Sequence, residues 1–294
     1  MVRVKSREFT VEADGERRVV VVPKRLRFED EANVDPVAVG DRVDLTGDPP
    51  RVQSVEPRAN EIGRPASGRR GRRQVFAANL DLAVIVLSAR SPVWKPATLD
   101  RYLVLASASG IAAGVCLNKI DLDPSVREAP ELSVYAELGI PIRFTSVPGG
   151  EGLEALGTLL AGKICVFLGP SGAGKSSLIG ALTGHEAITG EVSERTGKGQ
   201  HTTTWVEMIP IPGGGGVVDS PGLRVLDLTG VEAGELAGHF PELAARASGC
   251  RFNDCGHREE PGCAVKAAVE AGEIAAHRYD SYLRIGRSLR SGLG

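Results

Sequence analysis

The feature of the sequence that most constrains the fold is a glycine-rich run with the pattern G-x-x-x-x-G-K-S, formed by Gly169, Pro170, Ser171, Gly172, Ala173, Gly174, Lys175 and Ser176. An apolar stretch at 164–168 indicates a buried strand before the run, and residues 177–182 indicate the first turns of a helix after it. Glycines allow successive backbone N–H groups to face phosphate oxygens, and a helix N-terminus adds the positive end of its dipole.

This strand–loop–helix context favours a phosphate-binding loop over a plain glycine turn that carries an exposed lysine. The loop therefore predicts binding of a nucleoside triphosphate. We expect Lys175 to reach the β- and γ-phosphates, where it also serves catalysis, and we expect Ser176 to ligate Mg²⁺.

Composition sets limits on the rest of the chain. The net charge of −2 indicates no partner by itself. Residues 1–15 hold no long apolar segment, so we expect no signal peptide, and runs such as 83–87 are too short to span a bilayer. We therefore expect a cytoplasmic protein with no membrane partner. Its five cysteines should be reduced, which favours metal binding over disulfides.

Residues 1–72 have the pattern of a small β-domain. Segments 8–12 and 17–22 indicate short strands joined by an Asp-Gly turn, and 39–45 and 51–55 indicate two more. Several short strands with turn signals predict an OB-type β-barrel, a fold that often binds nucleic acid.

An arginine-rich stretch ends this first domain. Arg58 begins it, Glu61 is its one acidic residue, and interleaved glycines predict a flexible basic loop. A solvated linker is the alternative, but beside a barrel we favour contact with an RNA phosphate backbone. The RNA-binding candidates are Arg64, Arg69, Arg70, Arg72 and Arg73.

Residues 73–228 change to continuous apolar runs. The segments 82–87 and 114–117 indicate strands buried on both faces, and helical stretches follow each strand. This alternation predicts a doubly wound parallel sheet, in which ligands bind at the carboxyl ends of the strands.

The second of these buried strands ends in Asn118, Lys119, Ile120 and Asp121, which form the pattern N-K-x-D. The Asp121 carboxylate can accept hydrogen bonds from N1–H and the 2-amino group of guanine, donors that adenine lacks in this arrangement. Asn118 either contacts the other purine edge or braces the neighbouring loop. Ser146, in a short segment after another predicted strand, is similar to the guanine-edge loop of GTPases.

Two segments after the phosphate loop have the character of switches. The polar stretch 189–204 predicts a loop that a γ-phosphate and Mg²⁺ order, with Thr203 or Thr202 as a Mg²⁺ ligand. In Asp-x-x-Gly, Asp219 would hold Mg²⁺ through a water molecule, and the Gly222 N–H would contact the γ-phosphate.

Leu223 stands where many Ras-like GTPases have a glutamine that orients the attacking water. We therefore expect slow unaided hydrolysis. His201 is the candidate for positioning the water, and an exposed loop histidine with no such role is the alternative.

The order of the motifs is unusual. The base-reading motifs at 118–121 and 145–147 precede the phosphate loop, whereas in ordinary GTPases they come last. The chain resembles a circularly permuted GTPase, and whatever follows residue 228 is then attached directly to the second switch.

Residues 229–294 predict a helical domain that holds a metal. Three thiols and an imidazole with the spacing C-x₄-C-x-H-x₅-C suit a closed, tetrahedral, structural zinc site, whose ligands are Cys250, Cys255, His257 and Cys263. Cys116 and Cys165 lie in predicted core strands, where we expect them to act as small buried apolar residues.

Taken together, these motifs resemble the RsgA family, also called YjeQ, over essentially the whole chain. The resemblance implies GTP binding by 118–121 and 169–177, including Ser177, and zinc binding by the C-terminal motif. It also implies contact of both flanking domains with ribosomal RNA, and hydrolysis stimulated by the small ribosomal subunit during its late maturation. We expect a monomer that binds GTP and GDP. The alternatives are a metabolic phosphotransferase and a non-enzymatic RNA-binding module.

Overall fold

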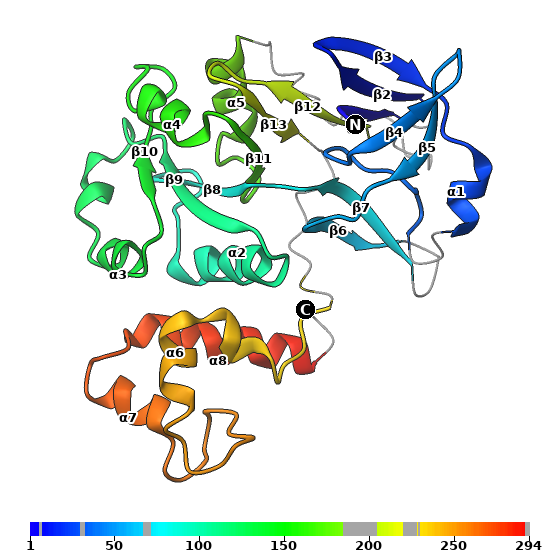
Figure 1. The fold of residues 1–294 in the computed structure, drawn as a ribbon. Helices are drawn as coiled ribbons and strands as arrows, with labels where there is room; N and C mark the ends of the chain where they lie inside the picture. The colour runs from blue at the N-terminus through cyan, green and yellow to red at the C-terminus, as the bar shows by residue number, and fades with distance from the viewer. Residues whose placement is uncertain are drawn as a thin grey trace, which may run out of the picture.

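The computed structural model describes residues 1–5, 8–29, 33–66, 72–184, 205–219, 228 and 230–291. A single nine-stranded sheet runs through the molecule in the order β10-β9-β8-β11-β13-β12-β1-β2-β3 (Figure 1). Its parallel half consists of β10 (Ile142–Phe144), β9 (Ala112–Asn118), β8 (Leu82–Ser88), β11 (Lys163–Leu168) and β13 (Gly215–Asp219).

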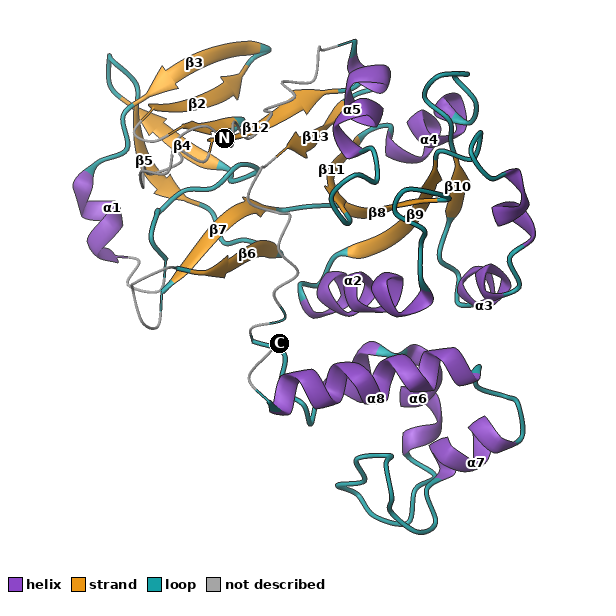
Figure 2. Cartoon of the chain, turned by 180° about the vertical axis from the view of Figure 1, so that it is seen from behind, coloured by secondary structure: helices purple, strands orange, loops and turns teal. Residues whose placement is uncertain are grey.

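Helices cover both faces of this parallel half (Figure 2). One face carries α2 (Pro96–Ala108), the 3₁₀ turn η1 (Pro124–Glu128) and α3 (Glu131–Glu137), and the other carries α4 (Leu153–Leu160) and α5 (Lys175–Thr183). Every residue of β8 is buried, as expected for a strand enclosed on two sides. The predicted doubly wound sheet is therefore confirmed.

The other half of the sheet joins the core to the chain's first strands. β12 (Trp205–Pro210) pairs antiparallel with β13, and β1 (Arg3–Lys5) pairs antiparallel with β12. β2 (Glu8–Ala13) and β3 (Glu16–Val20) follow as a hairpin. The sequence did not predict β1, and its pairing makes the first hairpin an extension of the same sheet.

Two further hairpins complete the N-terminal module, which we define as the described residues up to Ala78. One hairpin consists of β4 (Val43–Thr46) and β5 (Arg51–Val55), and the other consists of β6 (Glu61–Pro65) and β7 (Arg73–Ala78). A short helix, α1 (Lys24–Glu29), precedes both hairpins in the chain. The module has an apolar core of its own, which includes Phe9, Val11 and Val52. An isolated bridge also joins Val39 to Ala77, and these two residues pack in the larger core of the parallel half. The β6–β7 hairpin spans residue 72, where the sequence placed the end of the first domain.

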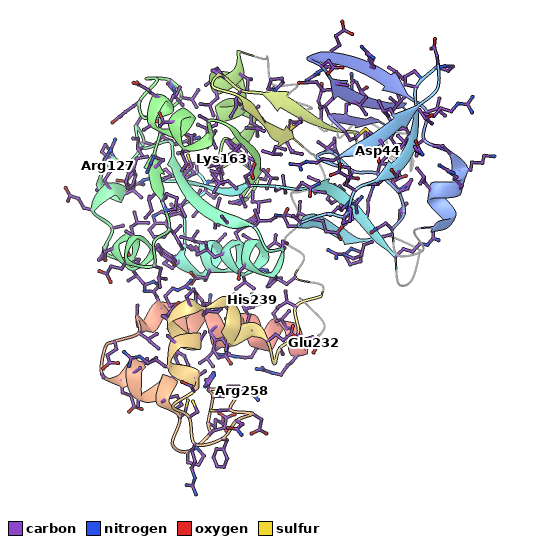
Figure 3. All side chains as sticks on the ribbon, in the orientation of Figure 1. Asp44, Arg127, Lys163, Glu232, His239 and Arg258 are labelled. Atoms are coloured by element: carbon purple, nitrogen blue, oxygen red, sulfur yellow. The ribbon has the colours of Figure 1, made fainter. Side chains whose placement is uncertain are left out.

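The C-terminal module, residues 230–291, is helical. It contains the 3₁₀ turn η3 (Leu236–His239), α6 (Pro241–Ala247), α7 (Ala264–Glu270) and α8 (Ala276–Arg290). It packs against α2, and Figure 3 shows His239 at this contact and Arg258 on the loop at the far end. Within the described ranges, none of the helices has the length and apolar character that a bilayer crossing requires.

Candidate nucleotide site and metal centre

The predicted phosphate loop lies between β11 and α5, at the carboxyl edge of the parallel strands. Gly169 has φ +141°, and a Cβ there would lie 2.1 Å from the Val86 carbonyl oxygen, so only glycine fits. The Lys175 ammonium donates to the carbonyl oxygens of Gly169 (2.6 Å) and Pro170 (2.9 Å). The lysine therefore closes the loop upon itself, and Ser176 and Ser177 follow it in the first turn of α5.

The N-K-x-D segment meets this loop directly. Asn118 is the last residue of β9, is 2% exposed, and donates from Nδ2 to the Ala173 carbonyl oxygen at 3.0 Å. A Cβ on Gly174, whose φ is +95°, would lie 2.3 Å from that nitrogen. The sequence left two roles open for Asn118, and in this structure it braces the phosphate loop.

Lys119 provides a second connection between the two motifs. It has φ +60°, and its ammonium donates to the carbonyl oxygens of Gly172 (2.6 Å) and Ser91 (2.9 Å). Ser91 lies in the loop after β8, which sequence reasoning missed. Because β8 ends at the same sheet edge as β9 and β11, the position of its end was the signal that could have found this loop.

The remaining base-reading residues differ in their surroundings. The Ser146 hydroxyl donates to Oδ1 of Asp121 at 2.6 Å, which orients this exposed carboxylate. Ile120 is 2% exposed, and its side chain packs in the hydrophobic core. Its N–H donates to the Thr145 carbonyl oxygen at 3.2 Å, which fixes the two base-reading loops together.

The predicted Mg²⁺ ligands Ser176 and Asp219 come from neighbouring elements. Asp219 is the last residue of β13, which runs parallel to β11, so both residues lie at the carboxyl edge of the sheet. A hydroxyl and a carboxylate are the hard oxygen donors that Mg²⁺ requires. The other predicted residues at this site lie outside the described residues, and they are His201, Thr202, Thr203, Gly222 and Leu223.

The four predicted metal ligands come together in the C-terminal module. The ligand atoms of Cys250, Cys255, His257 and Cys263 all lie within 4.8 Å of one another. His257 Nδ1 is 3.5 Å from the sulfur atoms of Cys250 and Cys263, which are themselves 3.9 Å apart. Tetrahedral zinc with Zn–S bonds of about 2.3 Å sets neighbouring ligands about 3.7 Å apart, so this donor set fits zinc.

The segment that carries the four ligands, residues 250–263, is called the metal loop here. Groups outside the ligand set hold it in place. The Glu260 carboxylate accepts from the backbone N–H groups of Gly256, Arg258 and Glu259, and these hydrogen bonds lower its pKa to about 2. The hydroxyls of Tyr279 and Tyr282, both in α8, donate to the carbonyl oxygens of His257 and Gly256, each at 2.7 Å. These donors hold the backbone on either side of the imidazole ligand.

The arginine-rich stretch is more ordered than the sequence predicted. Arg58 is bound to Asp41 and Glu61, with side-chain exposures of 13%, 0% and 26%, so it is a structural ion-pair residue. Arg64 stacks over the Phe76 ring at 5.4 Å and donates to Gln74. The expectation of a wholly flexible loop was therefore wrong at β6, whose residues pair with β7.

Two of the other RNA-binding candidates, Arg72 and Arg73, lie at the start of the second strand of this hairpin. Arg73 forms an ion pair with Glu61 at 3.2 Å while remaining half exposed, and Arg72 lies just before it. Arg69 and Arg70 lie outside the described residues.

Known proteins resemble this chain over nearly its whole length. Residues 55–229 match the family model described as RsgA GTPase. Two relatives named "Small ribosomal subunit biogenesis GTPase RsgA" are 40% identical (Gemmatimonas aurantiaca, 92% of this chain and 90% of the relative) and 39% identical (Chlorobaculum parvum, 98% and 96%).

Solved structures give the same result for the fold. YjeQ from Thermotoga maritima superposes with a TM-score of 0.78 at 33% identity, with 98% of each chain covered. YloQ, described as a circularly permuted GTPase, superposes with a TM-score of 0.74 at 28% identity, over 99% of this chain and 96% of YloQ.

Proposed function

Because this chain belongs to the RsgA family of circularly permuted GTPases, we propose that it binds the small ribosomal subunit and hydrolyses GTP during the subunit's late maturation, with hydrolysis stimulated by the subunit. The chain is a GTPase of ribosome biogenesis. That work belongs in the cytoplasm, and we propose that a monomer performs it.

One observation supports this proposal more than any other. The base-reading motif and the phosphate loop, 50 residues and more apart in the chain, are joined by hydrogen bonds from Asn118 to Ala173 and from Lys119 to Gly172. A guanine held by Asp121 would therefore sit in a fixed relation to the phosphates bound by the loop. Such fixed geometry lets binding energy position the γ-phosphate for attack.

We assign the nucleotide contacts as follows. GTP is held by the residues of the two base-reading segments, the phosphate loop and the second switch: Asn118, Lys119, Ile120, Asp121, Ser146, Gly169 to Ser177, and Gly222. Mg²⁺ is held by Ser176, Thr203 and Asp219, and it would neutralise charge on the β- and γ-phosphate oxygens.

The flanking modules provide the RNA contacts in this proposal. Arginines of the β6–β7 hairpin and of the segment that joins its two strands contact the ribosomal RNA backbone, and these are Arg64, Arg69, Arg70, Arg72 and Arg73. The C-terminal ligand set holds one structural zinc ion, which shapes a second RNA-contacting surface. One face of the Arg64 guanidinium lies over the Phe76 ring, so Arg64 contributes through the other face.

Turnover is slow until the partner binds, in this proposal, because Leu223 replaces the water-orienting glutamine. His201 or a ribosomal group then positions the attacking water. Lys175 must leave the carbonyl oxygens of Gly169 and Pro170 to reach the phosphates, so nucleotide binding and opening of this contact go together.

The experiment that tests the proposal is steady-state GTP hydrolysis by the purified protein alone, with small ribosomal subunits, and with large subunits as the control. We expect slow turnover that rises many-fold only with small subunits, and we expect Lys175→Ala to abolish it. Equal stimulation by any RNA would contradict the assigned partner.

A second variant tests base recognition. Asp121→Asn should shift the purine preference from guanine toward xanthine, because the new amide donates where the carboxylate accepted. An unchanged preference would remove the base-recognition argument and favour a phosphotransferase that uses the phosphate loop for other chemistry.

A further inference from the structure

We propose that Cys116 is a positioning residue for nucleotide binding, whose thiol fixes the orientation of the Asn118 side-chain amide through the hydroxyl of Thr145. This inference rests on the proposed binding of guanine nucleotide at 118–121 and 169–177. It concerns a residue that belongs to neither motif and that the sequence indicated only as a buried apolar group.

The direction of the hydrogen bonds follows from the acceptor at one end. The Ala173 carbonyl can only accept, so the Asn118 atom 3.0 Å away must be the amide nitrogen. The other amide atom, Oδ1, then faces the Thr145 hydroxyl at 3.1 Å. Because Oδ1 can only accept, Thr145 must donate its single proton to Asn118.

The same reasoning then determines the role of the thiol. With its proton directed at Asn118, the Thr145 oxygen can only accept from the Cys116 sulfur, which lies 3.2 Å away. Cys116 is fully buried, and burial raises the pKa of its thiol to about 12, so the thiol keeps its proton at neutral pH. The result is a one-way chain of donors from Cys116 through Thr145 and Asn118 to Ala173.

This chain of hydrogen bonds connects the interior of the sheet to the phosphate loop. The Asn118 amide nitrogen passes close to Gly174, where a Cβ would lie 2.3 Å away, so its contact with Ala173 depends on the glycine at this position. Without the thiol, the Thr145 hydroxyl loses the donor that fixes its rotation. The Asn118 amide then samples other orientations. Nucleotide binding has to order the amide again, and this entropy cost lowers the affinity.

The chain carries a matched control for the experiment. Cys165, in β11, is also fully buried, and it belongs to the same apolar cluster as Cys116. In the part of the chain that the structure describes, its thiol has no hydrogen-bond partner. Truncating Cys165 thus removes a similar buried volume from the same core without touching the chain of hydrogen bonds.

The experiment compares Cys116→Ala, Cys116→Ser and Cys165→Ala in the full-length protein. Calorimetry measures the Kd for GDP, thermal unfolding measures stability, and steady-state assays measure kcat for GTP. We expect Cys116→Ala to raise the Kd about two- to tenfold, the range for one hydrogen bond, with kcat unchanged. Cys116→Ser should restore the affinity because serine keeps a donor, and Cys165→Ala should keep the wild-type Kd.

Two results would overturn the inference. One is an equal rise in Kd for Cys116→Ala and Cys165→Ala, which would indicate a general effect of core truncation. The other is a wild-type Kd for Cys116→Ala. Both are read against wild-type GDP binding, so a wild-type protein that bound no guanine nucleotide would instead contradict the proposed function.

Discussion

The N-terminal module joins the nucleotide-binding core through a shared β-sheet, whereas the C-terminal module joins it through side chains packed against α2. At the first junction, β1 pairs with β12, and the Met208 N–H donates to the Val2 carbonyl oxygen at 2.8 Å. The hydrogen bonds of an antiparallel pair are made by backbone N–H and C=O groups, so substitution of a side chain leaves these groups in place.

The second junction is centred on Arg278 of α8, which is 2% exposed. Its guanidinium forms ion pairs with Asp100 of α2 and Glu242 of α6, and it lies over the Phe240 ring at 4.6 Å. The Tyr135 hydroxyl of α3 also donates to Asp100, at 2.8 Å. One side chain therefore connects three helices of two modules.

The difference has a consequence for how each module responds to the nucleotide. β12 precedes β13, which ends at Asp219, so the N-terminal module is hydrogen-bonded to the sheet that carries a predicted Mg²⁺ ligand. The C-terminal module follows the second switch along the chain, and its contact with α2 combines the buried charges at Arg278 with apolar packing against Val104. We therefore expect the first junction to be rigid and the second to be sensitive to single substitutions.

The largest effect should come from Arg278→Met. This change leaves the Asp100 carboxylate buried without its cation, which costs about 3–5 kcal/mol of unfolding free energy. Urea denaturation measures the change. The control is Arg284→Met on the exposed face of the same helix, which should stay within about 0.5 kcal/mol.

The pH dependence of this variant provides a further check. Burial already raises the pKa of Asp100, while the charge of Arg278 opposes that shift. Without the arginine the pKa rises further, so the folded state binds the proton more tightly than the unfolded chain does. The variant's stability should then fall as pH rises above about 3.9, the ordinary pKa of Asp. A penalty independent of pH would show that the charge is not its cause.

Removal of the proposed zinc ion should have the next largest effect. At a free zinc concentration of one hundred times the Kd, bound metal stabilises the folded state by about 2.7 kcal/mol. Chelation should therefore lower hydrogen-exchange protection in α7 and α8 while leaving β1 and β12 protected.

Calcium should not replace zinc in this experiment, because it prefers oxygen ligands to thiolates. Cys255→Ser should remove the response to zinc. Loss of protection at β1 and β12 on chelation would contradict the separation of the two junctions.

A smaller effect is expected for the tyrosines that link the metal loop to α8. Tyr282→Phe keeps the edge-on contact with Phe240, at 5.8 Å between ring centroids, but it removes the hydrogen bond to Gly256. We expect a loss of about 1 kcal/mol. Tyr279→Phe should cost less because this residue is more exposed, and equal costs would show that burial does not strengthen the bond.

The sequence predicted the features whose residues are close in the chain or share one spacing rule. The strand–loop–helix at 164–182 and the ligand set at 250–263 are local, and the parallel sheet follows from buried runs such as β8. The β1–β12 pairing was not predictable in this way, because a three-residue strand carries little signal and its partner lies about two hundred residues away.

The surroundings of charged residues were also not predictable from the sequence. Arg58 belonged to a basic run that indicated RNA contact, yet Asp41 binds it in a buried ion pair. Nothing near Arg278 in the sequence indicates its ion-pair partner, because Asp100 lies 178 positions earlier in the chain. A run of like charges shows only which residues are neighbours in the sequence. Whether such a residue is buried depends on its contacts with residues that are distant in the sequence.

The smallest effect should come from Glu207→Gln at the first junction. Glu207, on β12, pairs with Arg17 at 3.1 Å and with Arg3 at 3.8 Å, and the two arginine side chains are 38% and 33% exposed. Ion pairs this open to solvent contribute up to about 1 kcal/mol, so we expect a loss below that value. Hydrogen exchange at the Met208 amide should stay slow, because its bond to Val2 does not involve the side chain. A loss of unfolding free energy above about 2 kcal/mol, with rapid exchange at the Met208 amide, would show that side chains also hold this junction. The two junctions would then differ only in how strongly they depend on side chains.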